Sequence, residues 1–327
     1  MDNQTLTAID GIRVGHAHNL AGPTGCTVVL CPPNTVGGVD QRGGAPGTRE
    51  TDLLRPMHLI EHVNGVVLAG GSAYGLDAAT GVMRYLEENG IGYNVGVGVV
   101  PIVPAAVIFD LDLGDPSIRP DAQMGYTACL NAAEEIVEEG CVGAGAGARV
   151  GMLMGTHMAC KSGIGNAAIE LDNGLIVAAL IAVNAAGDIY DADGNIIAGL
   201  RQPPDGTHFM DGLSVLRASA AMEFPPTQSS NTVVGVVATN AKLSKEETNK
   251  IAQMAQDGLA RAIRPAHTMF DGDTMFALAT GSGPRANVNA IGAFTAEMTA
   301  IAIRRAVQLS KPLFNLPIGA SIQGKDS

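Results

Sequence analysis

The sequence predicts an α+β fold in which two central sheets are covered by helices on both outer sides. The chain has 327 residues, of which 46% are hydrophobic and only 16% charged, and this balance predicts a sizeable buried core. Segments typical of strands and of helices are mixed along the whole chain, and few of them have a polar face. No internal repeat stands out, so we treat residues 1–327 as one domain.

The N-terminal third predicts short strands followed by a strand, a glycine turn and a helix. Residues 12–14 and 26–30 are typical of strands joined by a Gly-Pro turn. Residues 65–72 form an apolar strand that leads into a helix over 75–88, whose apolar residues share one face. Residues 37–47 are predicted to be a glycine-rich loop, but its spacing is not that of a phosphate-binding loop, so we expect no nucleotide there.

The strand-turn-helix unit carries Ser72 in the pattern Gly-x-Ser-x-x-Gly. This spacing is one residue longer than that of a nucleophile elbow. The favoured interpretation is that Gly70 and Gly71 let the backbone approach a binding site closely and that Ser72 and Tyr74 line it. A role for Ser72 as a nucleophile is the less favoured alternative.

A helix is predicted over residues 51–63, and it carries an H-x-x-E-H zinc pattern formed by His58, Glu61 and His62. Nothing obvious supplies a further ligand, and Glu and His are ordinary residues on a helix surface. We therefore expect no metal and no cofactor.

The second half of the chain predicts the remaining helices and one strongly apolar strand. Residues 123–139 and 287–309 are typical of helices, and residues 175–183 of a buried strand that ends at Asn184. Ser244 begins a capping box, which predicts a helix that stops at Arg264 and Pro265.

Charge and cysteine content restrict the partners and the compartment. A net charge of −12 argues against nucleic acid and anionic membranes as partners. No apolar stretch is convincing as a membrane span, and the N-terminus lacks the features of a signal peptide. Five cysteines without a Cys-x-x-Cys pair fit reduced thiols, so we expect a cytoplasmic protein.

The Asn231–Thr232 dipeptide stands between a polar, Pro-bearing segment, 224–230, and a β-branched run typical of a buried strand. If this peptide bond broke, Thr232 would carry both a hydroxyl and a free α-amine, a known pairing of nucleophile and base. An α-amine titrates near ~8, against ~10.4 for a lysine amine, so it can act as a base at neutral pH. Considered alone, the dipeptide more often marks a strand start after a turn. The Pro-rich residues 200–230 would supply the exposed linker that such a cut requires.

Two carboxylates, Asp271 and Asp273, flank Gly272 just ahead of a second predicted strand, 275–280. They could hold and orient a protonated amine or the Thr232 hydroxyl, and such close carboxylates push each other's pKa apart. The alternative is an ordinary Asp-Gly turn between a helix and a strand.

With these motifs in place, the chain resembles the DmpA-type aminopeptidases (L-aminopeptidase/D-esterase family), which include the nylon-oligomer (6-aminohexanoate oligomer) hydrolases. The resemblance covers nearly the whole chain in family order. Its matching pieces are Gly11-Ile12-Arg13-Val14-Gly15-His16, Gly22-Pro23-Thr24-Gly25-Cys26-Thr27-Val28, Asp40-Gln41-Arg42-Gly43-Gly44-Ala45-Pro46-Gly47, Gly70-Gly71-Ser72-Ala73-Tyr74-Gly75-Leu76, Asn231-Thr232 and Asp271-Gly272-Asp273-Thr274.

The resemblance implies a four-layer αββα sandwich and an N-terminal-nucleophile amide hydrolase that cuts itself into residues 1–231 and 232–327. Thr232 would be the nucleophile, and Asn184 would help bind the oxyanion. The Asp271-Gly272-Asp273 motif resembles that of the nylon-oligomer hydrolases more than that of the aminopeptidases, which have Ser and Glu at these two acidic positions. Short peptides or amino-acyl amides with a free amino end are the implied substrates. Family members form tetramers, so a homo-oligomer is expected.

Two positions depart from the family pattern. A tyrosine that helps bind the oxyanion falls on Phe109, which has no hydroxyl, and a lysine of the nylon-hydrolase site falls on Met152, which has no charge. Losing one oxyanion donor can cost ~10²–10³ in rate. Two alternatives therefore stay open: an acyltransferase resembling the ornithine acetyltransferases, and a non-catalytic ligand-binding relative.

Overall fold

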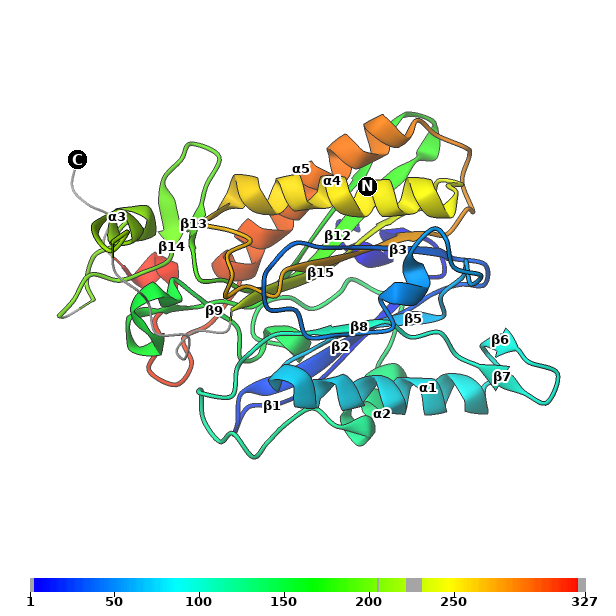
Figure 1. Ribbon diagram of the computed structural model, residues 1–327, viewed down its shortest axis with the longest axis horizontal. Coiled ribbons are helices and arrows are strands. Elements are labelled where there is room, and N and C mark those ends of the chain that lie inside the picture. Colours follow the sequence, from blue (N-terminus) through cyan, green and yellow to red (C-terminus); the bar gives the residue numbers. More distant parts are fainter. Residues whose placement is uncertain (1–2, 205, 222–230, 323–327) are drawn as a thin grey trace.

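Two five-stranded sheets stack face to face between two pairs of helices (Figure 1). The structure is a computed structural model that describes residues 3–204, 206–221 and 231–322. The first sheet has the order β1-β2-β5-β8-β4, with strands Arg13–Asn19, Thr24–Leu30, Gly65–Ala69, Ala105–Val107 and Thr48–Arg49. The second has the order β11-β12-β15-β17-β3, with strands Ile164–Glu170, Ile176–Asn184, Thr232–Thr239, Thr274–Ala279 and Val36–Gln41.

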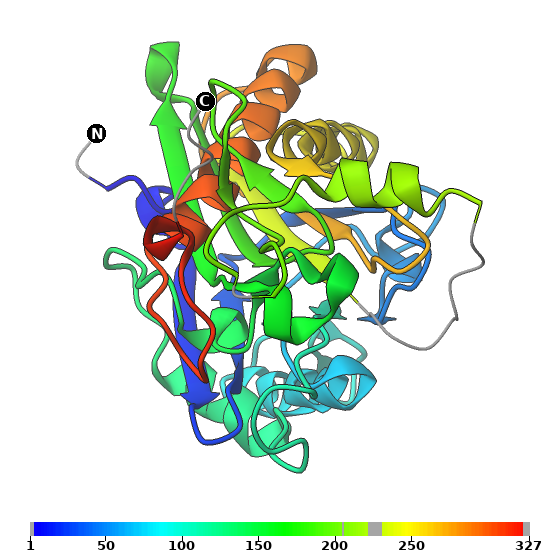
Figure 2. The same ribbon diagram turned by 90° about the vertical axis from the view of Figure 1, so that its left-hand side faces the viewer.

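Helices cover the outer face of each sheet, as the turned view also shows (Figure 2). Helices α1 (Ala78–Glu88) and α2 (Ala122–Leu130) pack on the first sheet, and α4 (Lys245–Ala262) and α5 (Val288–Gln308) pack on the second. A shorter helix, α3 (Gly212–Ala218), lies apart from these layers. The expected αββα sandwich is confirmed.

The remaining strands are short and form small sheets beside the main layers. These are β6 (Tyr93–Asn94) with β7 (Val99–Val100), β9 (Arg149–Val150) with β10 (Cys160–Lys161), and β13 (Asp188–Tyr190) with β14 (Ile196–Ala198) and β16 (Ile263–Arg264).

Side-chain alternation along the central strands fills three separate apolar layers. In β15, Val234 and Val236 point to the core between the two sheets, whereas Val233 and Val237 point to the core under α4 and α5. Successive strand residues face opposite sides, and here both sides are buried. The apolar run of β15 is therefore continuous rather than alternating, because no face of this strand meets water.

Glycines bring the helices of one pair into backbone contact. A Cβ on Gly81 of α1 would lie 1.7 Å from the Ala122 carbonyl oxygen, and one on Gly125 of α2 would lie 2.0 Å from that of Ala78. Only glycine fits at two such contacts. The chain has 42 glycines, and some of them are therefore required for close packing of helices.

The helix predicted over residues 51–63 is wrong. Only Asp52–Leu54 forms a single 3₁₀ turn, and Arg55 is extended with ψ 144°. The next residue is Pro56, which disfavours a helical conformation before it. The freed carbonyl groups of this loop are held by Lys245, whose Nζ donates to the oxygens of Leu53, His58 and Ile60.

Two other predicted segments also differ. The helix expected over 123–139 ends at Leu130, because Val14 of β1 pairs with Ala133 through two backbone hydrogen bonds of 3.0 and 3.2 Å. The loop expected over 37–47 is an edge strand, β3, in its first half. The capping box at Ser244 and its helix α4 are confirmed, as are the strands that follow Asn231 and Gly272.

Candidate active site

Thr232 is the first residue of β15 and is almost fully buried, with 3% of its surface exposed. Its Cα lies opposite that of Asn184, the last residue of the neighbouring antiparallel strand β12. On the other side, residues 231 and 271 form a parallel bridge. The β-branched run that follows Thr232 explains this position, because it forms a central strand of which the threonine is the first residue.

The acidic turn is bound directly to the strand that carries Thr232. The Asp273 carboxylate accepts a hydrogen bond from the Val233 N–H through Oδ1, at 2.8 Å. Its Oδ2 is 2.8 Å from Nδ1 of His267 and also accepts the His267 backbone N–H at 3.1 Å. The side chain of Asp273 is buried, so these contacts fix its orientation.

Asp271 lies on the same turn in a different environment. Its Oδ2 accepts the backbone N–H and the hydroxyl of Thr268, at 2.7 and 2.6 Å. Burial, together with the nearby Asp273 charge, raises the pKa of Asp271 to about 6. The direction of this shift is the one expected for a buried carboxyl beside a like charge.

Gly272, between the two carboxylates, lies against the threonine side chain. A Cβ at this position would stand 2.8 Å from Thr232 Oγ1 and 2.8 Å from the Ala45 carbonyl oxygen. The loop of the motif at 40–47 packs against the same turn, since a Cβ on Gly43 would lie 2.1 Å from the Asp271 backbone carbonyl oxygen. The glycines of these two motifs thus allow three backbone segments to meet at the threonine.

Asn184 is held at both ends of its amide. Its Oδ1 accepts the Arg149 backbone N–H at 3.2 Å, and its Nδ2 donates to the Phe109 carbonyl oxygen at 3.0 Å. Phe109 thus contributes to the site through its backbone carbonyl oxygen, although its side chain has no hydroxyl.

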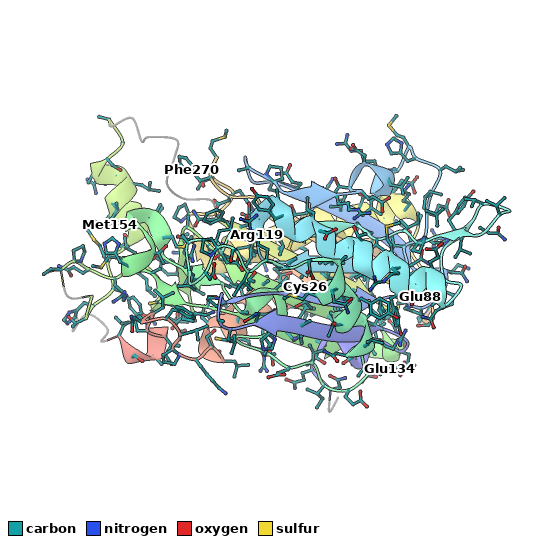
Figure 3. All side chains as sticks on the ribbon, turned by 90° about the horizontal axis from the view of Figure 1, so that it is seen from below. Cys26, Glu88, Arg119, Glu134, Met154 and Phe270 are labelled. Carbon is teal, nitrogen blue, oxygen red and sulfur yellow. The ribbon has the colours of Figure 1, made fainter. Side chains whose placement is uncertain are left out.

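The loop with Ser72 and Tyr74 joins the same region through residues 108–110. Ser72 has a left-handed φ of 55° and donates its N–H to the Ile108 oxygen at 2.9 Å. No hydrogen bond among the described residues links its hydroxyl to a histidine or a carboxylate. Tyr74 is 59% exposed and stacks with the Arg119 guanidinium, 3.7 Å from the ring centroid. Figure 3 shows Arg119 and Phe270 toward one end of the sheets and Glu88 toward the other.

Three charged residues that support this region lack a recognisable sequence signal. Asp110 accepts the Gly71 N–H at 2.6 Å, and burial raises its pKa to about 6. Arg149 is fully buried, pairs with Asp112, and its Nε contacts the Met152 sulfur. Lys161 is fully buried, and its Nζ donates to the carbonyl oxygens of Gly145, Ala148 and Ser162. Burial lowers the pKa of Lys161 to about 8.

Met152 therefore has a charged neighbour, although it carries no charge itself. The position where the nylon hydrolases are expected to have a lysine is occupied by a buried thioether beside the Arg149 guanidinium. A positive charge is thus present near this position, supplied by a different residue.

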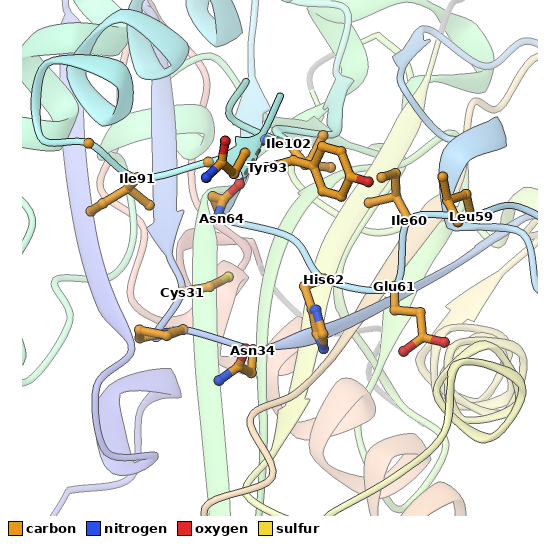
Figure 4. A pocket seen from close by; sticks show the side chains of 14 residues that line it. Cys31, Asn34, Leu59, Ile60, Glu61, His62, Asn64, Ile91, Tyr93 and Ile102 are labelled. Carbon is orange, nitrogen blue, oxygen red and sulfur yellow. Dashed lines mark hydrogen bonds between the residues drawn. The ribbon is translucent and has the colours of Figure 1, made fainter. Parts of the chain in front are cut away.

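The H-x-x-E-H pattern belongs to a different part of the molecule. Glu61 and His62 line a cavity of about 550 Å³ together with Cys31 and Asn64 (Figure 4). Cys31 and Asn64 adjoin the end of the first sheet at which Leu30 of β2 is paired with Gly65 of β5. The loop at Gly70 follows the opposite end of β5, where Cys26 is paired with Ala69. In the part of the chain that the structure describes, no group of three or more His, Cys, Asp or Glu could hold a metal ion.

Solved structures share this fold at low sequence identity. A β-aminopeptidase from Burkholderia sp. has a TM-score of 0.71 at 20% identity, with 97% of this chain and 90% of that chain covered. An L-aminopeptidase D-Ala-esterase/amidase from Ochrobactrum anthropi, described as a variant of the Ntn-hydrolase fold, has a TM-score of 0.71 at 18% identity, with 99% and 91% covered. The fold is therefore that of the N-terminal-nucleophile hydrolases. Within the described ranges, no helix is both long and apolar enough to span a membrane.

Sequence relatives match over most of their length. An uncharacterized aminopeptidase of Mycobacterium leprae (strain TN) is 48% identical over 299 residues, which cover 85% of this chain and 79% of the relative. A 6-aminohexanoate-oligomer endohydrolase of Kocuria sp. (strain KY2) is 33% identical over 270 residues, which cover 83% and 73%. The family model for peptidase family S58 matches residues 4–314. The chain therefore belongs to peptidase family S58 and is a hydrolase of peptide or amide bonds.

Proposed function

We propose that the protein is a self-processing N-terminal-nucleophile hydrolase that cleaves its own Asn231–Thr232 bond and then uses Thr232 on substrates. The observation that carries this proposal is the position of Thr232. It starts a central strand, lies opposite Asn184, and is followed by a residue whose N–H is bound to Asp273 at 2.8 Å. In the uncut chain Thr232 is buried, and its hydroxyl contacts the carbonyl oxygen of Asn231, the group that the proposed cleavage would attack.

In the mature protein the new α-amine of Thr232 takes the proton of its own hydroxyl as Oγ1 attacks the substrate carbonyl. The Nδ2 group of Asn184 carries two N–H bonds, of which Phe109 takes one, so the other remains for the oxyanion. Asp273 orients the amine end of the strand, and Asp271 supplies a second carboxylate beside it. Water then hydrolyses the ester on Thr232.

Short peptides and amino-acyl amides with a free amino end are the substrate class that we infer. The aminopeptidase names of the relatives support this class. We infer that Ser72, Tyr74 and Phe109 contribute to substrate binding. The Ser72 N–H binds the Ile108 oxygen, and the Phe109 oxygen binds the side chain of Asn184, so the three residues are connected to Asn184. The acyltransferase and the non-catalytic alternatives are not favoured, because the family and the named relatives are hydrolases.

Mass spectrometry of the intact purified protein tests self-cleavage. We expect two species of about 24 and about 10 kDa, in proportion to residues 1–231 and 232–327 of the 33.4 kDa chain. Thr232→Ala should give one species of full length without amidase activity. Thr232→Ser keeps a hydroxyl and should still be cut. A single full-length wild-type species with full activity on an aminoacyl amide would overturn the proposal.

We also propose that the protein is cytoplasmic and assembles into a homo-oligomer, the tetramer that the resemblance implies. All five cysteines are free, which fits a reducing compartment. Large apolar side chains are exposed at the end with the cavity, among them Met57, Leu59 and Val97. Such exposed apolar surface is typical of contacts between proteins. Light scattering coupled to size-exclusion chromatography would measure the number of subunits.

A further inference from the structure

The carbonyl group of Asn231 is held by two donors on the uncut chain. Its oxygen accepts the Gly272 backbone N–H at 2.8 Å and the Thr232 hydroxyl at 2.5 Å. The Asn231 N–H donates to the Phe270 oxygen at 3.0 Å, which aligns the peptide with residues 270–272. This carbonyl group is the one that self-cleavage would attack.

We propose that the Gly272 N–H, and not Asn184, stabilises the oxyanion during self-cleavage, so that cutting and substrate turnover use different oxyanion donors. This inference rests on the self-processing function proposed above. Among the hydrogen bonds of the described residues, Asn184 makes none to Asn231; its amide is bound to Arg149 and Phe109 instead. The Gly272 N–H already points at the oxygen on which the negative charge forms, and a donor in that position needs little reorganisation.

The cleavage step balances with groups that the chain itself supplies. A bond forms between Thr232 Oγ1 and the Asn231 carbonyl carbon, and the negative charge falls on the Asn231 oxygen beside the Gly272 N–H. The carbon–nitrogen bond then breaks, its electron pair stays on the Thr232 nitrogen, and the hydroxyl proton ends there. Water hydrolyses the resulting ester, leaving a carboxylate on Asn231 and a free hydroxyl and amine on Thr232.

The residue at position 272 must be glycine for this arrangement. An added Cβ would stand 2.8 Å from Thr232 Oγ1 and 2.8 Å from the Ala45 carbonyl oxygen, distances that Cβ atoms in proteins essentially never show. Any side chain would therefore displace either the nucleophile or the N–H donor. The steric restriction is an observation independent of the hydrogen bond, and both point to the same backbone group.

Asn184→Ala separates the two reactions. Self-cleavage, followed by intact mass on freshly synthesised protein, should keep a rate within about threefold of wild type, whereas turnover of an aminoacyl amide should fall by about 10²–10³. If Asn184→Ala stays uncut while its thermal unfolding remains like that of wild type, the proposed division of donors is wrong. A wild-type chain that never cuts would instead contradict the proposed function itself.

A pair of variants at position 272 tests the N–H group directly. Gly272→Ala and Gly272→Pro both add a Cβ, but only proline removes the donor. We expect Gly272→Ala to cut slowly and Gly272→Pro to cut at least about tenfold more slowly still, with both checked for folding by thermal unfolding and gel filtration. Equal cleavage rates in the two folded variants would overturn the proposal. If Gly272→Pro does not fold, the Asn184→Ala result decides.

Discussion

The Val233 N–H and the Asp273 carboxylate are joined by a hydrogen bond of 2.8 Å, which ties the acidic turn to the residue immediately after Thr232. The two residues are 40 positions apart in the chain. Because β15 and β17 are parallel neighbours, the start of one lies beside the start of the other. A carboxylate that precedes β17 is thereby placed at the predicted nucleophile.

Asp273→Asn should lower turnover of an aminoacyl amide by about 10²-fold, the usual size of a lost acid–base or orienting group. An asparagine keeps the shape, but its NH₂ group would face the donors of either Val233 or His267. Asp271→Asn is the matched control, because Asp271 binds Thr268 rather than the strand of the nucleophile, and we expect a smaller loss. Steady-state kinetics on both variants measures the difference. An Asp273→Asn variant with wild-type kcat would contradict the assigned role.

Met152→Lys should destabilise the protein rather than restore the lysine of the nylon hydrolases. The new ammonium group would be buried beside the Arg149 guanidinium, and an uncompensated buried charge costs about 3–5 kcal/mol. Met152→Leu keeps the volume and should cost less than about 1.5 kcal/mol. Thermal unfolding of the two variants compares them, and a Met152→Lys protein as stable as wild type would show that this site tolerates a second cation.

Lys161→Met should lower the free energy of unfolding by about 1.5–3 kcal/mol, because it removes a charged donor from the carbonyl oxygens of Gly145, Ala148 and Ser162. Each of these oxygens keeps one neutral donor, from Ala148, Ser162 and Cys141 respectively. The exposed Lys250 provides a control, since its substitution by Met should change stability by less than about 0.5 kcal/mol. Urea unfolding of both variants gives the comparison. Equal stabilities would mean that other groups satisfy these carbonyls once the lysine is removed.

The carboxyl group of Asp188 should contribute to the pH dependence of the free energy of unfolding. Burial raises the pKa of Asp188 from 3.8 to about 7, so between these values the folded state holds a proton that the unfolded state has lost. Stability therefore falls as pH rises through this window. Asp188→Asn should make the slope less negative by up to about 1.4 kcal/mol per pH unit. The measurement is urea unfolding from pH 4 to 7, on the Thr232→Ala background so that one chain unfolds.

His16 provides a control of opposite sign for the same series. Burial lowers the pKa of His16 from 6.5 to about 4, so between these values the unfolded state binds the extra proton and stability rises with pH. His16→Gln should therefore make the slope more negative. Slopes that shift in the same direction in both variants would contradict the assignment of these two groups.

The helix predicted over residues 51–63 does not form, because a contact with a distant part of the chain outweighs the local helical preference. The apolar spacing of this segment fits a helix, but Pro56 interrupts it, and Lys245, far along the chain, binds the carbonyl groups that a helix would have paired internally. The helix expected to reach residue 139 likewise gives way at Ala133 to pairing with β1. In both places a contact with a distant segment replaces the local preference.

The sequence by itself determined the elements whose signals are local and strong: the buried strand that starts at Thr232, the capping box at Ser244, the glycine turn at Gly70 and the acidic turn at Asp271. Only the tertiary structure showed that the Arg149 N–H and the Phe109 oxygen hold Asn184, that Lys161 secures the segment before Arg149, and that the Gly272 N–H lies on the Asn231 carbonyl group. The physical reason is that periodicity and turn chemistry act between near neighbours in the chain. Hydrogen bonds made by buried backbone groups depend instead on which distant strands become neighbours, and no local pattern encodes that.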